Sequence, residues 1–371
     1  MIKILHIARP LGGIGTYIQL LNEHLDKNQF KNLILCNYKD DLSFIKDKTI
    51  NNNNFSHINL RREVSPLSDI ICLFSLLKKV KQIQPDVIHC HSAKAGFFGR
   101  LIGAYLGIST LYTPHAFSYL SSGSVFKKLL FLLIEKSFVR FPSSILCCSE
   151  SEYHRAVFDL NFKKNKVFIW RNSIKDPSLF LKLKNTSKLT ENYICSIGRL
   201  SFQKNPLLLI DVFEEIKKRG KSFKLVVLGV GFYSPFLAKI NKVIRDKNLI
   251  NDVFLMNWTG REEVLQILKN ALLYVSTSKY EGLPYSLLEA LSLSKACVVT
   301  DVDGNKDLVI NNFNGYKLPE NAKEIAEKII WLIENTNERK QMEYNSRKLF
   351  EKSFRIEDNI HLLQDIYKKV V

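Results

Sequence analysis

The chain lacks an apolar run of the roughly 18–20 residues that a membrane-spanning helix needs. Its seven cysteines, in 371 residues, are scattered, odd in number and form no C-x-x-C pair. A disulfide framework and a zinc site are therefore both disfavoured. The opening MIKILHIARP begins directly as a strand and shows no secretory signal peptide. We expect a cytoplasmic protein, either free or peripheral on the inner face of the plasma membrane.

Signatures of several other enzyme classes are also missing. Gly12, Gly13 and Gly15 form a tight turn after the first predicted strand, but their spacing is not the G-x-G-x-x-G of a dinucleotide site. The second predicted strand ends at Asn37 instead of an acid, and no Tyr-x-x-x-Lys pair is suitably placed. A nucleotide-sugar epimerase is therefore disfavoured. A phosphorylase that uses pyridoxal phosphate is disfavoured because the chain is short and offers no specific lysine.

The formal net charge of +18 and the pI near 9.4 favour an anionic partner. Nucleotides, nucleic acids, lipid phosphates and anionic membrane surfaces all qualify. A lysine-rich proteome would give the same balance without functional meaning. Because no recognised nucleic-acid module is present, we do not expect nucleic acid as a partner.

Strand and helix patterns alternate along the chain, which predicts two domains with parallel, doubly wound sheets. In the first half, short apolar segments read as buried strands at 2–8, 32–37, 85–91, 109–114 and 143–149. In the second half they lie at 192–198, 224–231, 252–258, 271–277 and 296–301. We expect an N-terminal domain over 1–170 and a C-terminal domain over 171–371, joined near 167–178. Ligands are expected in the cleft, at the carboxyl ends of the strands.

Two carboxylates stand at a fixed interval around the turn after the strand at 271–277. Glu281 precedes the chain breakers Gly282 and Pro284, and Glu289 lies one turn inside the helix that follows. The unpaired N–H groups of this helix start suit a phosphate, and the carboxylates can accept hydrogen bonds from hydroxyl groups. Ser286 is expected to cap the helix. As an alternative, Ser286-x-x-Glu289 fits a purely structural capping box, and Glu281 is a solvated loop acid.

Two basic residues lie five positions apart in the loop that follows the strand at 192–198. Arg199 can hold phosphate oxygens bidentately and Lys204 adds a compact charge, which together suit a departing diphosphate. The alternative is a solvated surface pair. Gly229 begins a G-x-G turn after the next strand, where close approach to a nucleotide is expected.

Three histidines lie at strand ends in the first half. His89 and His91 alternate along the strand at 85–91, where His89 reads as core and His91 as an edge residue. They do not predict a metal site, because no third ligand can be named. His115 follows Pro114 at the end of the strand at 109–114, so its side chain is expected to face the cleft.

These segments resemble the retaining glycosyltransferases of family 4, which have the GT-B fold of two Rossmann-like domains facing across a cleft. The likeness rests on the E-x7-E signature with its EGLP turn, on G-R-L…Q-K, on the Gly-Gly loop and on His115. It covers nearly the whole chain. The resemblance implies catalytic roles for His115, Glu281, Arg199 and Lys204. It implies donor binding by Gly12, Gly13, Arg199, Lys204, Gly229, Gly282, Leu283, Pro284, Tyr285, Ser286 and Glu289.

The implied reaction moves a hexose-type sugar from a UDP- or GDP-linked donor to a saccharide acceptor with retention of the anomeric configuration. Glu289 would bind the ribose and Glu281 the transferred sugar, while Arg199 and Lys204 stabilise the leaving diphosphate. No residue stands out as a covalent nucleophile. We expect no cofactor and no metal. A D-x-D sequence at 301–303 is like the metal motif of the GT-A fold, but it lies too late in the second domain for that role.

The acceptor is inferred from the segment 124–141, SVFKKLLFLLIEKSFVRF, where basic residues surround an apolar helix and Glu135 is the only acid. The segment reads either as a basic amphipathic helix on an anionic inner membrane or as a core helix with a solvated edge. The first reading favours a polyprenyl-diphosphate-linked acceptor in bacterial surface polysaccharide assembly. The alternative is a non-catalytic, basic nucleotide- or nucleic-acid-binding protein, or another nucleotide-sugar enzyme. A C-terminal helix at 357–370 is expected to cross back onto the N-terminal domain.

Overall fold

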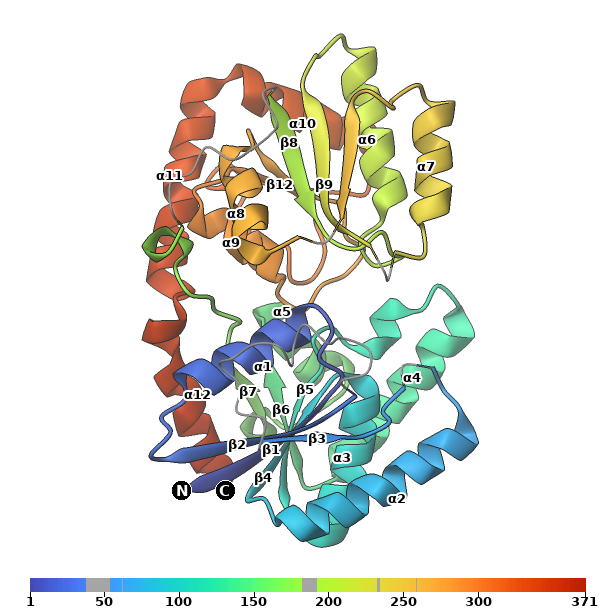
Figure 1. Cartoon of the computed structure of the whole chain (residues 1–371), viewed down its shortest axis with the longest axis vertical. Coiled ribbons are helices and arrows are strands. Elements are labelled where there is room, and N and C mark those ends of the chain that lie inside the picture. Colours follow the sequence, from blue (N-terminus) through green and yellow to red (C-terminus); the bar gives the residue numbers. More distant parts are fainter. Residues whose placement is uncertain (38–53, 62, 182–191, 232–233, 258) are drawn as a thin grey trace. The chain divides into compact units, whose positions relative to one another are not determined.

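The structure is a computed structural model that describes residues 1–37, 54–61, 63–181, 192–231, 234–257 and 259–371. The chain divides into two compact units (Figure 1). Unit 1 consists of residues 1–172 and 356–371, and unit 2 consists of residues 173–355. Within the described ranges, no helix is both long enough and apolar enough to cross a membrane.

In the described part of unit 1, seven parallel strands form one sheet with the order β3-β2-β1-β4-β5-β6-β7. The order reverses between β1 and β4, so the loops after these two strands diverge at the carboxyl edge of the sheet. All five residues of β4 are buried, as expected for a parallel sheet that is covered on both faces. The strands are β1 (Ile2–Ala8), β2 (Phe30–Cys36), β3 (Phe55–His57), β4 (Val87–His91), β5 (Ser109–Thr113), β6 (Ser143–Cys147) and β7 (Val167–Ile169).

Helices cover both faces of this sheet. Leu76 and Phe98, from α2 and α3, belong to the same buried apolar cluster as Leu5 of β1. On the opposite face α1 contacts α12, whose Tyr367 reaches His89 of β4 with 2.7 Å between hydroxyl and ring nitrogen. The last helix thus belongs to unit 1. The helices are α1 (Gly13–His24), α2 (Pro66–Ile83), α3 (Ala93–Leu106), η3 (Ser118–Ser121), α4 (Val125–Ser137), η4 (Phe138–Arg140), α5 (Glu150–His154), η5 (Arg155–Asp159), η6 (Lys164–Lys166) and α12 (Ile356–Val370).

In the described part of unit 2, six parallel strands form a second sheet with the order β10-β9-β8-β11-β12-β13. Its order reverses between β8 and β11. Leu209 of α6 and Ile329 of α10 pack with strand residues such as Val298 in one apolar core. The strands are β8 (Tyr193–Ile197), β9 (Lys224–Val230), β10 (Val253–Asn257), β11 (Tyr274–Ser276), β12 (Cys297–Thr300) and β13 (Gly315–Leu318). The helices are η7 (Pro177–Leu179), α6 (Pro206–Lys218), α7 (Leu237–Asp246), α8 (Arg261–Asn270), α9 (Tyr285–Ser292), α10 (Ala322–Glu334) and α11 (Thr336–Ser353).

The predicted pair of doubly wound parallel sheets is confirmed, and every predicted strand segment contains a strand. The prediction missed β3, β7 and β13. Each of these has only three or four residues and lies at the edge of its sheet. A short edge strand pairs on one side only, so its sequence carries less of the continuous apolar pattern that marks a central parallel strand.

Candidate active site

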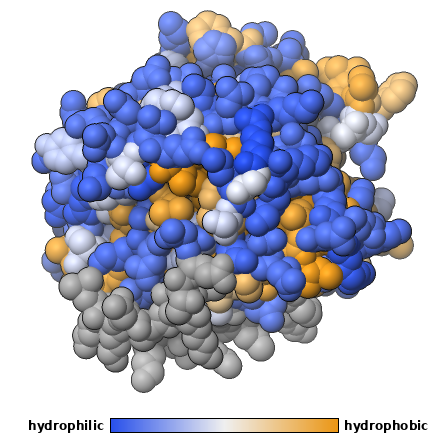
Figure 2. Space-filling view, turned by 90° about the horizontal axis from the view of Figure 1, so that it is seen from above, coloured by the Kyte–Doolittle hydropathy of each residue, from blue (hydrophilic) through white to orange (hydrophobic). Residues whose placement is uncertain are grey.

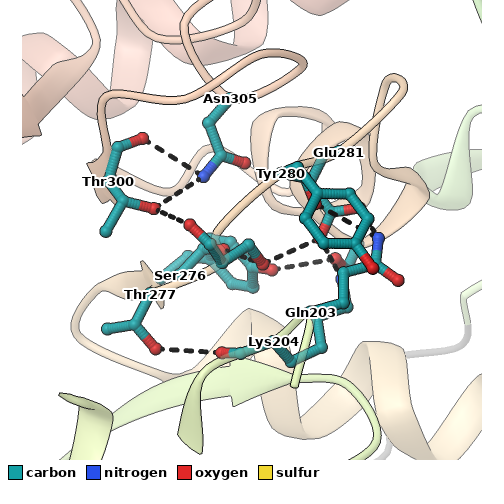
Figure 3. Close-up of polar contacts among 11 residues, drawn as sticks. Gln203, Lys204, Ser276, Thr277, Tyr280, Glu281, Thr300 and Asn305 are labelled. Atoms are coloured by element: carbon teal, nitrogen blue, oxygen red, sulfur yellow. Dashed lines mark hydrogen bonds and ion pairs between the residues drawn. The ribbon is translucent and has the colours of Figure 1, made fainter. Parts of the chain in front are cut away.

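The carboxyl ends of β8 and β11, at the reversal point of the unit 2 sheet, bring Lys204 and Glu281 together (Figure 3). Lys204 Nζ lies 2.7 Å from Glu281 Oε1. The Glu281 side chain is only 7% exposed, and that of Lys204 is 24% exposed. A carboxylate that is so little exposed requires charged or hydrogen-bonding partners. Glu281 is therefore not a solvated loop acid.

Both oxygens of the Glu281 carboxylate accept hydrogen bonds from neighbouring side chains. Oε1 also accepts from Ser278 Oγ at 2.7 Å, and Oε2 accepts from Gln203 Nε2 at 3.1 Å. Gln203 Nε2 also donates to the carbonyl oxygen of Tyr280 at 3.2 Å. Figure 3 shows Gln203 and Lys204 reaching Glu281 from the loop after β8. These contacts fix the direction of the carboxylate.

Two glycines leave room for this ion pair. A Cβ at Gly198 would lie 2.9 Å from Lys204 Cε, so the lysine stem lies directly over bare backbone. Gly304 has a φ of +78°, and a Cβ there would lie 2.7 Å from the Cβ of Glu281 and 2.8 Å from the carbonyl oxygen of Gly282. Gly304 thus supports the turn that carries Glu281. This contact could not be predicted from the sequence, because it joins two loops that follow different strands.

Arg199 lies beside Lys204 at the end of β8 and is half-buried. Both residues line one small pocket, together with Gly198, Ser276, Thr277 and Ser278 among others. Gly229 differs from its prediction, because it lies inside β9 and not in a turn after it. Its φ is +84°, and the pairing of β9 with β10 skips it. Gly229 is therefore a β-bulge, a place where glycine's conformational freedom is required.

Glu289 lies in α9 and forms an ion pair with Arg261, the first residue of α8. The Arg261 Nη2 to Glu289 Oε1 distance is 3.0 Å, and the Glu289 side chain is 12% exposed. Burial raises the pKa of the Glu289 carboxyl, and the positive charge of Arg261 opposes that rise. Sequence reasoning missed Arg261, which lies in a separate helix with no motif of its own.

The start of α9 corrects the predicted cap. The helix begins at Tyr285 with Pro284 in the capping position, so Ser286 is its second residue and does not cap it. The Ser286 hydroxyl instead accepts a hydrogen bond from Tyr274 OH at 2.8 Å. This position of Ser286 also excludes the capping-box alternative for Glu289. Gly282, Leu283 and Pro284 are buried, and Tyr285 and Ser286 are half-buried.

In unit 1, Gly12 and Gly13 lie where β1 turns into α1, at the carboxyl edge of the sheet. Gly13 is the first residue of the helix, and Gly12 precedes it with φ +58° and ψ −127°. A side chain at Gly12 would meet open space, so the backbone conformation, and not crowding within the protein, favours glycine there. Both glycines are exposed.

His115 lies just after β5 in unit 1 and contacts His91, which in turn contacts His6. Its Nε2 is 3.1 Å from His91 Nδ1, and His91 Nε2 is 3.0 Å from His6 Nδ1. Burial lowers the pKa of His115 to about 3 and that of His6 to about 4, and it holds the pKa of His91 well below its usual range. The rings are therefore neutral near pH 7. Sequence reasoning missed His6, because only the pairing of β1 with β4 brings it beside His91.

Three of the histidines are close enough to hold a metal ion. His6, His89 and His91 present ligand atoms that all lie within 4.8 Å of one another. However, the His89 nitrogens already contact Tyr367 OH at 2.7 Å and Thr113 Oγ1 at 2.9 Å. A metal would have to replace these bonds and the bond between His6 and His91, so the donor set fits a resident metal poorly. The D-x-D sequence at 301–303 is a turn after β12, where the carbonyl oxygen of residue 303 accepts from the N–H of residue 281.

Comparisons with known proteins agree with this architecture. The family model described as "Glycosyltransferase Family 4" matches residues 11–176, and "Glycosyl transferases group 1" matches residues 180–349. A relative from Escherichia coli, UDP-Gal:alpha-D-GlcNAc-diphosphoundecaprenol alpha-1,3-galactosyltransferase, is 27% identical and covers 100% of this chain and 97% of its own. The capsular polysaccharide biosynthesis glycosyltransferase CapM of Staphylococcus aureus is 25% identical over 95% of this chain and 93% of its own.

A solved structure shows the same fold. HepE of Anabaena, in complex with UDP-glucose, superposes with a TM-score of 0.80 at 17% identity and covers 100% of both chains. The two units therefore have the architecture of GT-B glycosyltransferases. This chain belongs to the glycosyltransferases, with a family 4 domain followed by a group 1 domain.

Proposed function

We propose that this enzyme transfers a hexose from a UDP-linked donor to a saccharide carried on polyprenyl diphosphate, with retention of configuration and without a metal. The E. coli relative is named for UDP-galactose and an undecaprenol-linked acceptor, and the HepE structure holds UDP-glucose. These names favour UDP over GDP as the nucleotide. CapM, which is named for capsular polysaccharide biosynthesis, favours a role in the assembly of bacterial surface polysaccharide.

The observation that carries the proposal is the ion pair of Lys204 and Glu281 at the reversal point of the unit 2 sheet. In open parallel sheets, ligands bind outside the carboxyl ends of the strands at this point. Lys204 and Arg199 supply positive charge for the donor diphosphate, and Glu281 supplies an acceptor for sugar hydroxyls. Glu289 accepts hydrogen bonds from the ribose hydroxyls, for which its ion pair with Arg261 must loosen in part.

The same contacts argue against Glu281 as a covalent nucleophile, because both of its oxygens are held by Lys204, Ser278 and Gln203. The reaction then proceeds on one face of the donor sugar. The bond between the anomeric carbon and the diphosphate oxygen breaks, and the acceptor oxygen bonds to that carbon from the same side. The acceptor's hydroxyl proton passes to the departing phosphate oxygen, whose developing charge Arg199 and Lys204 stabilise.

Calorimetry with UDP-, GDP- and ADP-sugars, in buffer with a chelator, tests the donor site. We expect the wild type to bind one nucleotide class selectively, and Arg199→Ala and Glu289→Ala to weaken that binding by about tenfold or more. Lys218→Ala is the control, because this lysine is 59% exposed and, among the described residues, forms its ion pairs with its helix neighbours Glu214 and Glu215. A folded wild type that binds none of the sugars refutes the proposed donor site and favours a non-catalytic binding protein.

Helix α4 supports the lipid-linked acceptor. The face in Figure 2 is mainly hydrophilic, with its hydrophobic residues in separate groups. Helix α4 exposes a run of large apolar side chains by 52% to 88%: Val125, Phe126, Leu129, Leu130 and Leu133. Lys127, Lys128 and Lys136 are exposed beside them. Glu135, the only acid of α4, is its single buried residue and pairs with Arg100 inside unit 1. This exposure fits a membrane-surface helix better than a core helix.

Vesicle flotation tests the membrane contact. We expect the wild type to float at low salt with vesicles that contain phosphatidylglycerol and not with pure phosphatidylcholine. The double variant K127E/K128E should bind at least about tenfold more weakly, because each basic residue near an anionic surface contributes about 1 kcal/mol. K163E/K164E makes the same charge change at exposed positions outside α4 and should still float. If the wild type does not bind anionic vesicles at low salt, the membrane part of the proposal is wrong.

A further inference from the structure

A hydrogen-bonded row of side chains crosses the unit 1 sheet and ends at His115. It starts at Asn32 in β2, whose Oδ1 lies 3.3 Å from His6 Nε2 in β1. His6 Nδ1 lies 3.0 Å from His91 Nε2 at the end of β4, and His91 Nδ1 lies 3.1 Å from His115 Nε2 after β5. Each histidine uses one ring nitrogen toward each neighbour. The row therefore has a definite direction from end to end.

The rings meet edge to edge. The planes of His6 and His91 differ by 22° with 5.3 Å between ring centroids, and those of His91 and His115 differ by 23° with 5.4 Å. Nearly parallel planes, together with nitrogen separations near 3 Å, place each N–H close to the plane of the next ring, where an unprotonated nitrogen holds its lone pair. His6 and His91 are 1% and 0% exposed, so water does not compete for these bonds.

The protonation of each ring then follows from its neighbour. A neutral imidazole has one N–H donor and one acceptor nitrogen, and an amide oxygen only accepts. His6 Nε2 must donate to Asn32 Oδ1, so His6 Nδ1 is unprotonated. It accepts from His91 Nε2, so His91 Nδ1 is unprotonated in turn. That nitrogen accepts from His115 Nε2, which leaves His115 Nδ1 as an acceptor.

We propose that the amide oxygen of Asn32, acting through His6 and His91, fixes His115 in the Nε2-protonated tautomer and so presents Nδ1 as a hydrogen-bond acceptor. Asn32, His6 and His91 are thus positioning residues. The benefit to sugar transfer rests on the proposed function, together with the catalytic role that the family resemblance implies for His115, which we take to be a hydrogen bond to a hydroxyl of the donor sugar. An Nδ1 without a proton accepts from the O–H of that hydroxyl, whereas the opposite tautomer would donate its Nδ1–H to the hydroxyl oxygen and so reverse the direction of the hydrogen bond.

The row orients His115 and does not conduct protons. An amide oxygen cannot take up a proton near neutral pH, so a proton that entered at His115 would have no group to receive it at the far end. It would leave a positive charge among buried rings, which is unfavourable. The arrangement also differs from a metal site, where nitrogens point their lone pairs at a common centre instead of at each other's N–H groups.

The test is nitrogen NMR on the full chain labelled with ¹⁵N-histidine at neutral pH without substrate, with the signals of His115 identified by their loss in His115→Gln. Long-range proton–nitrogen correlations show which ring nitrogen carries the proton. We expect a single Nε2-protonated form of His115 in the wild type. Asn32→Leu removes the acceptor at similar size, and an Nδ1-protonated form should then appear. His6→Phe interrupts the row at the next member and should act in the same way. Thr113→Val is the control, because the hydrogen bond that it removes joins the Thr113 hydroxyl to His89, which is not a member of the row.

An Nδ1-protonated His115 in the wild type would overturn the proposal, as would an unchanged tautomer in both Asn32→Leu and His6→Phe. Purified protein with about one equivalent of zinc on its histidines would also overturn it. Since the spectrum needs no substrate, it is separate from the transfer assay. A wild type with the expected tautomer and no transfer activity refutes the proposed function alone. Where transfer is measurable, kcat/KM should fall about tenfold in Asn32→Leu and less than about twofold in Thr113→Val.

Discussion

Lys204 and Glu281 lie 77 residues apart in the chain and meet with 2.7 Å between Nζ and Oε1. The contact joins the loop after β8 to the loop after β11, the two strands between which the sheet order reverses. One partner suits the negative charge of a departing diphosphate and the other suits sugar hydroxyls. The pair therefore sets the distance between the cation that suits the diphosphate and the carboxylate that suits the sugar. Each charged side chain also limits the movement of the other.

A double-mutant cycle on this pair should give a coupling free energy of about 1–3 kcal/mol in thermal or urea unfolding, because Glu281 is largely shielded from water. The cycle uses Glu281→Gln, Lys204→Met and the double variant. The control is Lys279 with Glu320, an ion pair of the same 2.7 Å length whose side chains are 31% and 40% exposed. Its coupling should stay below about 1 kcal/mol. Equal coupling in the two pairs would contradict the special position of Glu281.

Nucleotide binding should depend on pH through Glu289. Burial raises its pKa in the folded protein, so the protonated form persists to higher pH than in the unfolded chain. Because the folded protein binds this proton more tightly, the protonation of Glu289 contributes to the free energy of unfolding. This contribution is fully present below the unfolded pKa and is lost as pH rises through the folded pKa. Binding has the opposite sign, because the ionised carboxylate is the better acceptor for ribose hydroxyls. We expect the Kd for the nucleotide to fall as pH rises through the pKa of Glu289, and calorimetry from about pH 4.5 to 7 would measure it.

Arg261 supplies the matched variant for this pH dependence. Its positive charge lowers the pKa of Glu289 against the effect of burial, so Arg261→Ala should move the midpoint of binding to higher pH. Glu289→Gln cannot ionise and should bind weakly with no change across the range. A midpoint that stays in place, or moves down, in Arg261→Ala would show that another group controls the titration.

The sequence predicted the sheets well and the site only in part. Central strands of a parallel sheet are buried on both faces, so their apolar runs can be read locally. Arg199, Lys204 and Glu281 could be predicted from the sequence for a similar reason, because each lies in the loop that follows such an apolar run. Arg261 and Asn32 could not be predicted as site residues, since each gains its role from a side chain on a different helix or strand. The predicted roles of the site residues stay predictions until the binding and transfer measurements are made.

Gly304→Ala should destabilise the turn of Glu281. The φ of +78° is unfavourable for alanine, and the new Cβ would lie within 3.0 Å of Glu281 and of the Gly282 carbonyl oxygen. We expect a loss of about 1–3 kcal/mol in stability together with weaker donor binding. Gly220→Ala is a close control, because its φ is +74° and a Cβ there meets nothing within 4 Å. It should show the conformational cost alone and bind donor normally. Equal effects of the two substitutions would exclude the contact with Glu281 as the cause.

The buried ion pair beneath α4 should control how firmly that helix is held. Arg100 Nη2 lies 2.8 Å from Glu135 Oε2, and both side chains are at most 2% exposed. Tyr112 OH donates to the other carboxylate oxygen at 3.0 Å. Glu135→Gln removes one charge and leaves a buried guanidinium unpaired, which costs about 3–5 kcal/mol. We expect the unfolding midpoint to fall by about 6–20 °C and hydrogen exchange in α4 to accelerate.

The double variant R100M/E135L distinguishes the charge from the packing at this place. Replacing both partners with apolar side chains removes the unpaired charge, so much of the stability lost in Glu135→Gln should return. Tyr112 then loses its acceptor, which should keep recovery incomplete by about 1–3 kcal/mol. If the double variant is no more stable than Glu135→Gln, packing of the two side chains holds α4, and the ion pair does not. The same variants in the flotation assay would show whether α4 needs the buried ion pair of Arg100 and Glu135 in order to bind a membrane.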